Sequence, residues 1–329
     1  MSSATIKGEV HTLIRMNRLV DARQKCESLC NSTPSDPEAW FLLGSIHGQA
    51  GEPDKAIECL QRSIAIENKA AITHYNLGLI HLSRNDYTAA RSCFETALSL
   101  EPGFTAARHD LANAIQASGF PAEAVPHYLA VLQAEPAAPA VLVNLSIAHV
   151  SMGEPEKAIE LLRQAIRLDP SNSAAHFQLG KILGDLADFP EAVNHFRAVL
   201  DKQPDAVEAI ANLAHALLKS GDSDAAIDNY RKVLEIQGDS ADALFNLGNA
   251  LRAAGQADEA AATFRKTLEL SPGMSMALNN LGLVMHGQGK LGEAANLFRE
   301  SLENDSRQSE AAINLANCYR EMREPDRAI

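Results

Sequence analysis

The stretch ALFNLGNALRAAGQADEAAATFRKTLELSP, residues 243–272, contains two apolar runs that are separated by Gly255 and followed by Pro272. In the first run, apolar or small residues recur with the i, i+3, i+4, i+7 spacing of one helical face: Leu244, Leu247, Gly248 and Leu251. A second apolar stripe begins at Ala260, and Pro272 ends it because proline cannot continue a helix. The stretch therefore predicts two helices that are joined by a turn at Gly255.

This unit recurs every 34 residues without insertion or deletion. A Leu followed by a small residue returns at that interval from Leu43 to Leu315. Ala260 has an alanine at every equivalent position: Ala22, Ala56, Ala90, Ala124, Ala158, Ala192, Ala226, Ala294 and Ala328. The residue four places later is bulky, as in Leu60, Phe94, Tyr128, Leu162, Phe196, Tyr230, Phe264 and Phe298. One helix pair cannot bury its apolar face alone, so the period predicts a stack of pairs.

Numbered from Ala241 as position 1, the units begin at residues 3, 37, 71, 105, 139, 173, 207, 241, 275 and 309. This numbering divides the chain into an atypical first repeat at 1–36, eight regular repeats at 37–308 and a truncated tenth repeat at 309–329. At position 15, Gly or another turn former is expected to end the first helix of each repeat. The small residue at position 8 and the Ala at position 20 are expected to let the two helices approach closely.

The pattern resembles the tetratricopeptide repeat, which carries W-x2-L-G-x2-Y, A-x3-F and a final P over 34 residues. The second unit matches that pattern at Trp40, Leu43, Gly44, Ala56 and Leu60. The resemblance covers essentially the whole chain. It implies an all-α, right-handed solenoid of helix-turn-helix repeats, which with this many units should wind through about one turn or more and present a concave groove for protein or peptide partners.

Composition narrows the class of function. The formal net charge of −13 argues against a nucleic-acid groove, which needs a basic face, and against an anionic membrane surface. The five cysteines are dispersed, which fits a reducing cytoplasm. Because nearly every residue is accounted for by the period, the sequence leaves no separate place for a catalytic, cofactor or metal site, and the segment is not expected to be an enzyme.

Position 6 of the repeat carries a recurrent amide, although Asn is a mediocre helix former. From the second repeat on, and apart from Leu42, its residues are Asn76, Asp110, Asn144, Gln178, Asn212, Asn246, Asn280 and Asn314. On a helical wheel this position lies away from the core face, so we expect it to be exposed on the side that lines the groove. An amide both donates and accepts hydrogen bonds, so this ladder could hold the backbone of an extended peptide. The alternative is that the amides bond locally to the neighbouring helix.

Position 5 adds an apolar stripe beside the ladder. Its members are Phe41, Tyr75, Val143, Phe177, Phe245 and Ile313. These residues could form side-chain pockets, for which Phe177 and Phe245 are the candidates, or they could pack against the next repeat. In the repeats from residue 37 on, neither position 2 nor position 5 carries Lys or Arg, so a clamp for a chaperone's C-terminal carboxylate is not expected.

Histidines and cysteines follow the period as well. His47, His81 and His149 fall at position 11, and His74 and His176 fall at position 4, which predicts packing histidines. Cys26 and Cys30 lack the further ligands of a metal site. Cys59 and Cys93 occupy position 23 of adjacent repeats, and helices in contact lie too far apart for an unstrained disulfide there.

Ile329 stands at position 21 of the tenth unit, early in its second helix. This ending suggests a fragment of a longer protein. The array also resembles the N-terminal arm of O-linked N-acetylglucosamine transferases and SPINDLY-type glycosyltransferases, or that of bacterial sulfotransferases with similar repeats. Two hypotheses follow: a stand-alone scaffold, or the substrate-recruiting arm of a transferase. Self-association through an uncapped C-terminal face is a third and weaker idea.

Overall fold

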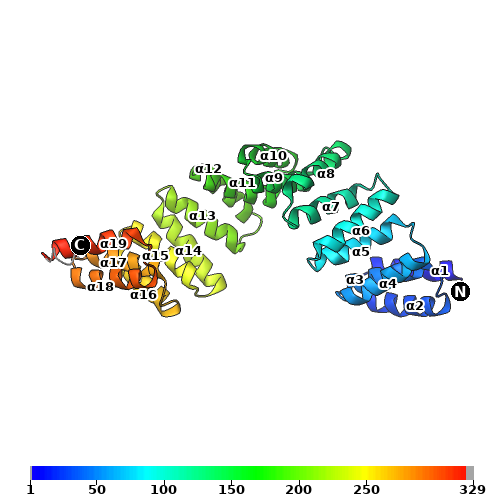
Figure 1. Ribbon diagram of the computed structural model, residues 1–329, viewed down its shortest axis with the longest axis horizontal. Coiled ribbons are helices and arrows are strands. Elements are labelled where there is room, and N and C mark those ends of the chain that lie inside the picture. The colour runs from blue at the N-terminus through cyan, green and yellow to red at the C-terminus, as the bar shows by residue number, and fades with distance from the viewer. Residues whose placement is uncertain (1, 324–329) are drawn as a thin grey trace. The chain divides into compact units, whose positions relative to one another are not determined.

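The computed structural model describes residues 2–323, and the ordered elements in that range are nineteen α-helices with no strand. The chain divides into two compact units, residues 1–170 and 171–329, each of which is a stack of helical hairpins (Figure 1). Consecutive helices pack as pairs, and each pair packs on the next within its unit. The predicted all-α repeat fold is confirmed. Ala328 and Ile329 lie outside the described residues.

The first unit contains ten helices. They are α1 (Ser3–Arg15), α2 (Leu19–Ser32), α3 (Pro37–Gln49), α4 (Pro53–Ile66), α5 (Ala71–Ser83), α6 (Tyr87–Leu100), α7 (Thr105–Ala117), α8 (Pro121–Ala134), α9 (Pro139–Ser151) and α10 (Pro155–Leu168). Five of them begin with proline, at a position where the missing N–H would have no helical partner.

The second unit contains nine helices within the described range. They are α11 (Ser173–Asp185), α12 (Phe189–Leu200), α13 (Val207–Lys219), α14 (Ser223–Gln237), α15 (Ala241–Ala253), α16 (Ala257–Leu270), α17 (Ser275–Gly287), α18 (Leu291–Asn304) and α19 (Ser309–Glu321). The odd-numbered helices are the first helices of their repeats. The candidate site lies on these first helices.

The turn inside each hairpin has a positive φ at position 15, where the sequence predicts a turn former. The angle is 75° at Gly255, and the same region is occupied at position 15 of every repeat: Asn17, Gly51, Asn85, Gly119, Gly153, Ala187, Gly221, Gly289 and Arg323. This left-handed conformation suits Gly and Asn, which explains why they dominate the position. Ala187, with φ of 62°, adopts it although alanine rarely does.

The close approach of the two helices depends on the pairing of position 8 with position 24. A Cβ atom added at Gly248 would stand 2.6 Å from Cε1 of Phe264, and the same distance separates a Cβ at Gly282 from Phe298. Ala260, at position 20, is fully buried. The expectation that small residues at positions 8 and 20 permit this packing is confirmed, and the large ring fills the space that they leave.

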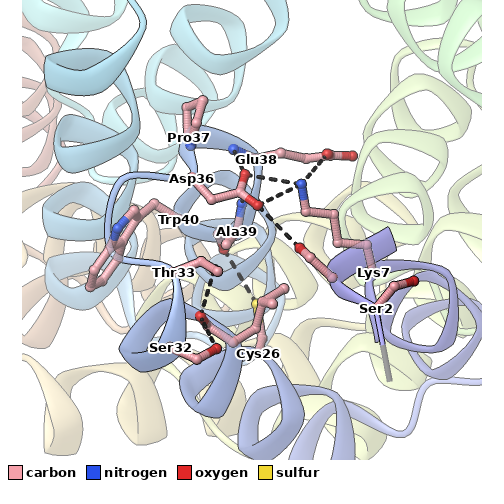
Figure 2. A network of polar contacts seen from close by, with 12 residues as sticks. Ser2, Lys7, Cys26, Ser32, Thr33, Asp36, Pro37, Glu38, Ala39 and Trp40 are labelled. Carbon is pink, nitrogen blue, oxygen red and sulfur yellow. Dashed lines mark hydrogen bonds and ion pairs between the residues drawn. The ribbon is translucent and has the colours of Figure 1, made fainter. Parts of the chain in front are cut away.

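The first hairpin is tied to the second repeat by a polar network (Figure 2). Nζ of Lys7 lies 2.7 Å from a carboxylate oxygen of Asp36 and 2.6 Å from one of Glu38. Sγ of Cys26 donates to the backbone oxygen of Ala39 at 3.3 Å. These contacts join α1 and α2 to the start of α3, so the first two helices are part of the same stack.

Candidate functional site

The amide ladder lies on the first helices, but it is less exposed than the helical wheel predicts. Every member from Asn76 to Asn314 is half-buried, and Leu42, which takes the same position in the second repeat, is fully buried. The wheel treats a helix as if it stood alone, whereas in the stack the first helix of the preceding repeat covers part of this side. The expectation that position 6 is exposed is therefore wrong in degree.

Three ladder amides donate to position 9 of the preceding repeat. Nδ2 of Asn76 lies 3.2 Å from Oγ of Ser45, Nδ2 of Asn144 lies 2.9 Å from Oδ1 of Asn113, and Nδ2 of Asn280 lies 2.6 Å from Oδ1 of Asn249. These bonds are the local contacts to the neighbouring helix that the sequence left as an alternative. They connect the first helices of adjacent repeats.

Other members of the ladder find different partners. Asn314 donates to Oδ1 of Asn279 at 3.1 Å, Asp110 accepts from the hydroxyl of Tyr75 at 2.9 Å, and Asn212 donates to the backbone oxygen of Glu208 at 2.8 Å. The side chain of Asn246 makes no hydrogen bond to any residue that the structure describes. Peptide binding by the ladder stays a prediction, and Asn246 is a member that is free to take part.

The position-5 aromatics pack within their own repeat and also line hollows. The ring of Phe245 lies 6.1 Å from that of Phe264, and the ring of Phe177 lies 6.0 Å from that of Phe196. Phe177 also lines a hollow of about 270 Å³ near the start of α11 and α13. Packing and pocket formation therefore coincide at this position.

Two adjoining hollows lie beside α15 in the second unit. The first, of about 490 Å³, is called the α13–α15 hollow and is lined by His215, Leu218, Lys219, Tyr230, Phe245, Asn246, Asn249, Arg252, Ala253 and Asn280. The second, of about 410 Å³, is called the α17–α19 hollow and is lined by Phe245, Met276, Asn279, Asn280, Arg307, Gln308, Ser309 and Glu310. Phe245 and Asn280 line both hollows, and the two hollows together are named here the α15 groove.

Charges are distributed along this groove by helix end. Position 2, near the start of the first helices, carries Glu208, Asp242 and Glu310. The last turns of α13 and α15 carry Lys219 and Arg252. The arrangement complements the helix dipoles. Of these groups, Lys219 and Arg252 line the α13–α15 hollow, and Glu310 lines the α17–α19 hollow together with Arg307.

Models described as the tetratricopeptide repeat match residues 35–100, 75–139, 185–228, 211–275 and 275–303, and one described as the TPR repeat matches 148–186. Together the matches span well over half of the chain. The chain belongs to the tetratricopeptide-repeat family.

Similar proteins carry the same repeat over different lengths. The chain is 36% identical over 61 residues to the general transcriptional corepressor CYC8 of Saccharomyces cerevisiae, which is 17% of this chain and 6% of that protein. A tetratricopeptide repeat protein from Parabacteroides merdae has a TM-score of 0.53 at 17% identity, over 76% of this chain and 98% of that one. A chain from the APC/C hetero-tetramer Cut9–Hcn1 has a TM-score of 0.50 at 19% identity, over 94% of this chain and 54% of that one. At these identities the two structures share the fold alone.

Sequence reasoning missed the basic and phenolic groups of the α13–α15 hollow. Lys219 stands at position 13 of its repeat and Arg252 at position 12 of the next. Most repeats carry an uncharged residue at these positions, so the periodic pattern does not identify the two. Tyr230 stands at the bulky position 24 and reads as a core residue. The signal that could have found them is that two adjacent repeats carry a basic residue at neighbouring positions where most other repeats do not.

The histidines at position 11 are packed into the hairpins, as the repeat pattern predicts, and each also contacts an acid at position 16. The distances from Nδ1 to the carboxylate oxygen are 2.7 Å for His47 and Glu52, 3.3 Å for His81 and Asp86, and 2.6 Å for His149 and Glu154. The acid stands at the start of the second helix, so the pair links the end of one helix to the start of the next.

We expect these acids to make the stability of the first unit depend on pH. The bonded Lys55, followed by the position-11 histidine, lowers the pKa of Glu52 below 4.5, and Lys157 with its histidine does the same for Glu154. A carboxyl group whose pKa is lower in the folded state than in the unfolded state stabilises the fold at pH values above the unfolded-state pKa. This stabilisation is lost as the pH falls through the folded-state pKa. The double variant Glu52→Gln and Glu154→Gln should therefore unfold at a lower urea concentration than wild type at pH 7, and the difference should close by pH 3.

A control for this prediction is Glu67→Gln, because Glu67 is exposed and forms no ion pair with a described residue. A gap between wild type and the double variant that is as wide at pH 3 as at pH 7 would contradict the assignment to these carboxylates.

The cysteines are free, and Cys26, Cys30, Cys59 and Cys318 are buried. No group of three or more His, Cys, Asp or Glu side chains in the described part of the chain is placed to hold a metal ion. Within residues 2–323, no helix has the length and apolar character needed to cross a membrane.

Proposed function

We propose that this tetratricopeptide-repeat protein is a non-enzymatic binding module that holds an extended segment of a partner protein along the α15 groove. The observation that carries the proposal is that Phe245 and Asn280 line both hollows. A strand of polypeptide needs a long site of this kind, with apolar surface for side chains and polar groups for its backbone.

The residues at the centre of the groove supply both kinds of contact. Phe245 is half-buried and presents part of its ring to both hollows, while Asn246, beside it, has amide donors and a carbonyl that no described residue engages. Asn280 uses one N–H on Asn249 and keeps a second one. The other ladder residues and Phe177 are proposed to make the same type of contact within their own units. These residues are Asn76, Asp110, Asn144, Gln178, Asn212 and Asn314.

The test is a selection from a phage-displayed library of random dodecapeptides against the whole chain, followed by affinity measurements on the selected peptides. The double variant Asn246→Ala and Asn280→Ala should lose about tenfold in affinity, since two lost hydrogen bonds contribute roughly 1–3 kcal/mol. Its melting temperature should change little, because Ala is the better helix former and offsets the lost bond between Asn280 and Asn249.

The matched control is Asn194→Ala, which removes an exposed amide from the second helix α12 of the same unit. Its affinity should equal that of wild type. If the selected peptides bind the double variant and wild type equally, the α15 groove is not the binding site.

The role of recruiting arm in a transferase uses the same groove, because such an arm would hold its protein substrate in this way. We propose it as the alternative to a stand-alone scaffold. The coding sequence beyond residue 329 distinguishes the two, since an arm requires a catalytic domain encoded there.

A further inference from the structure

Tyr230 carries a hydroxyl whose partner is missing from the described chain. Its side chain is only 3% exposed and lines the α13–α15 hollow, yet its Oη makes no hydrogen bond to any described residue. Tyr128, at the same position of another repeat, bonds to Oδ1 of Asn113 at 2.8 Å and to Oε1 of Gln116 at 2.9 Å. Among the described residues no side-chain polar atom is both closed off from solvent and unpaired, so Oη of Tyr230 is open to the hollow, where a ligand can bond to it.

The hydroxyl of Tyr230 is available as a donor. Burial raises the pKa of Tyr230 to about 12, so the phenol keeps its proton near neutral pH. The hollow also contains amide donors, because Nδ2 of Asn246 and Nδ2 of Asn249 bond to no other described residue. A ligand that fits these groups must accept several hydrogen bonds.

The charges around the hollow have one sign. Lys219 and Arg252 line it, and neither forms an ion pair within residues 2–323, while its lining includes no carboxylate. Partial burial, followed by the charge of Lys219, lowers the pKa of His215, which also lines it. In a chain with a net charge of −13, this is a local concentration of positive charge and hydrogen-bond donors.

We propose that the α13–α15 hollow selects partners by binding the side-chain carboxylate of an Asp or Glu in the extended segment. The proposal rests on the proposed function and adds to it that the segment is acidic. Tyr230 and Asn249 donate to the carboxylate oxygens, and Lys219 and Arg252 supply charge at the rim. A carboxylate satisfies these groups because it has two acceptor oxygens and the complementary charge.

A purely structural account covers part of these observations. Lys219 and Arg252 lie in the last turns of their helices, where a positive charge stabilises the helix dipole. That account does not involve the hydroxyl of Tyr230, which is open to the hollow, so the decisive variant is Tyr230→Phe, which removes the hydroxyl and keeps the ring.

The experiment measures fluorescence anisotropy with octaglutamate and octaglutamine peptides that are amidated at the C-terminus. Wild type should bind octaglutamate at least tenfold more tightly, and the preference should shrink in 0.5 M salt because exposed charges are screened. Tyr230→Phe should lose about tenfold of the affinity for octaglutamate, and the double variant Lys219→Gln with Arg252→Gln should lose about fivefold.

Two controls match these variants. Tyr128→Phe removes a hydroxyl that is bonded within the protein, and the double variant Arg197→Gln with Lys202→Gln changes the net charge equally through exposed residues outside the hollow. Both should bind octaglutamate as wild type does. Equal binding by Tyr230→Phe and wild type would overturn the proposal.

Other results separate the two levels of the argument. If octaglutamate and octaglutamine bind with equal affinity while the library peptides still depend on Asn246 and Asn280, the acidic preference is overturned. The α15 groove then remains the proposed binding site. A second result is that octaglutamine with a free C-terminus binds as tightly as amidated octaglutamate does. That result would show that the hollow binds the C-terminal carboxylate of a chain, and it would also overturn the proposal. If no peptide binds, including those from the library, the α15 groove is not a peptide-binding site and the proposed function itself is overturned.

Discussion

Replacing Phe264 with Ala should lower the free energy of unfolding by about 3–5 kcal/mol, as is typical for a large ring removed from a packed core. Phe264 is fully buried, and its ring fills the space above Gly248 between the two helices of the repeat. Gly248, which the ring faces, has no side chain that could close the cavity. Urea unfolding followed by circular dichroism measures the effect as a shift of the midpoint at constant slope.

The control for this variant is Leu270→Ala on the same helix. Leu270 is 53% exposed, so its truncation removes far less contact and should change the free energy of unfolding by about 0.5 kcal/mol. A Phe264→Ala midpoint as close to wild type as that of Leu270→Ala would mean that the ring does not hold the hairpin together.

Replacing Ala260 with Leu should lower the free energy of unfolding by about 1–3 kcal/mol, because the added atoms have no space in a packed core. Ala260 is fully buried where α15 and α16 approach, and Ala and Leu differ little in helix propensity, so the change isolates packing. The matched control is Ala262→Leu, since Ala262 is exposed on the same helix. Its midpoint should lie close to that of wild type, within about 0.5 kcal/mol.

Equal midpoints for Ala260→Leu and Ala262→Leu would show that α15 and α16 can move apart at little cost. The recurrence of Ala at position 20 would then need a reason other than close packing.

The repeat pattern predicted the local structure of each hairpin because local structure depends on residues near one another in the chain. The turn at position 15 follows from the need for a left-handed residue, and the structure places one there even at Ala187. The pairing of Gly248 with Phe264 spans only 16 positions within one repeat, so the spacing and sizes of these residues are enough to predict their contact.

The candidate site was harder to predict. The ladder residues were identified from their recurrence, but their half-buried state and their bonds to the preceding repeat depend on how two hairpins stack. His47 and its equivalents were correctly read as packing residues, while their acidic partners at position 16 were not foreseen. Such partners are polar residues in a turn, where the apolar period carries no information.

By itself, the sequence determined that this protein is an array of 34-residue helical hairpins, where each hairpin turns, and which faces are buried, because apolar spacing and turn chemistry act over a few residues. Only the tertiary structure decided that Tyr230, Asn249 and Arg252 come together in one hollow, and that the hydroxyl of Tyr230 lacks the partners that Tyr128 has. The physical reason is that a repeat pattern records what the units share. The hollow is instead built from residues that differ between units and meet only when the first helices α13, α15 and α17 stack beside α14.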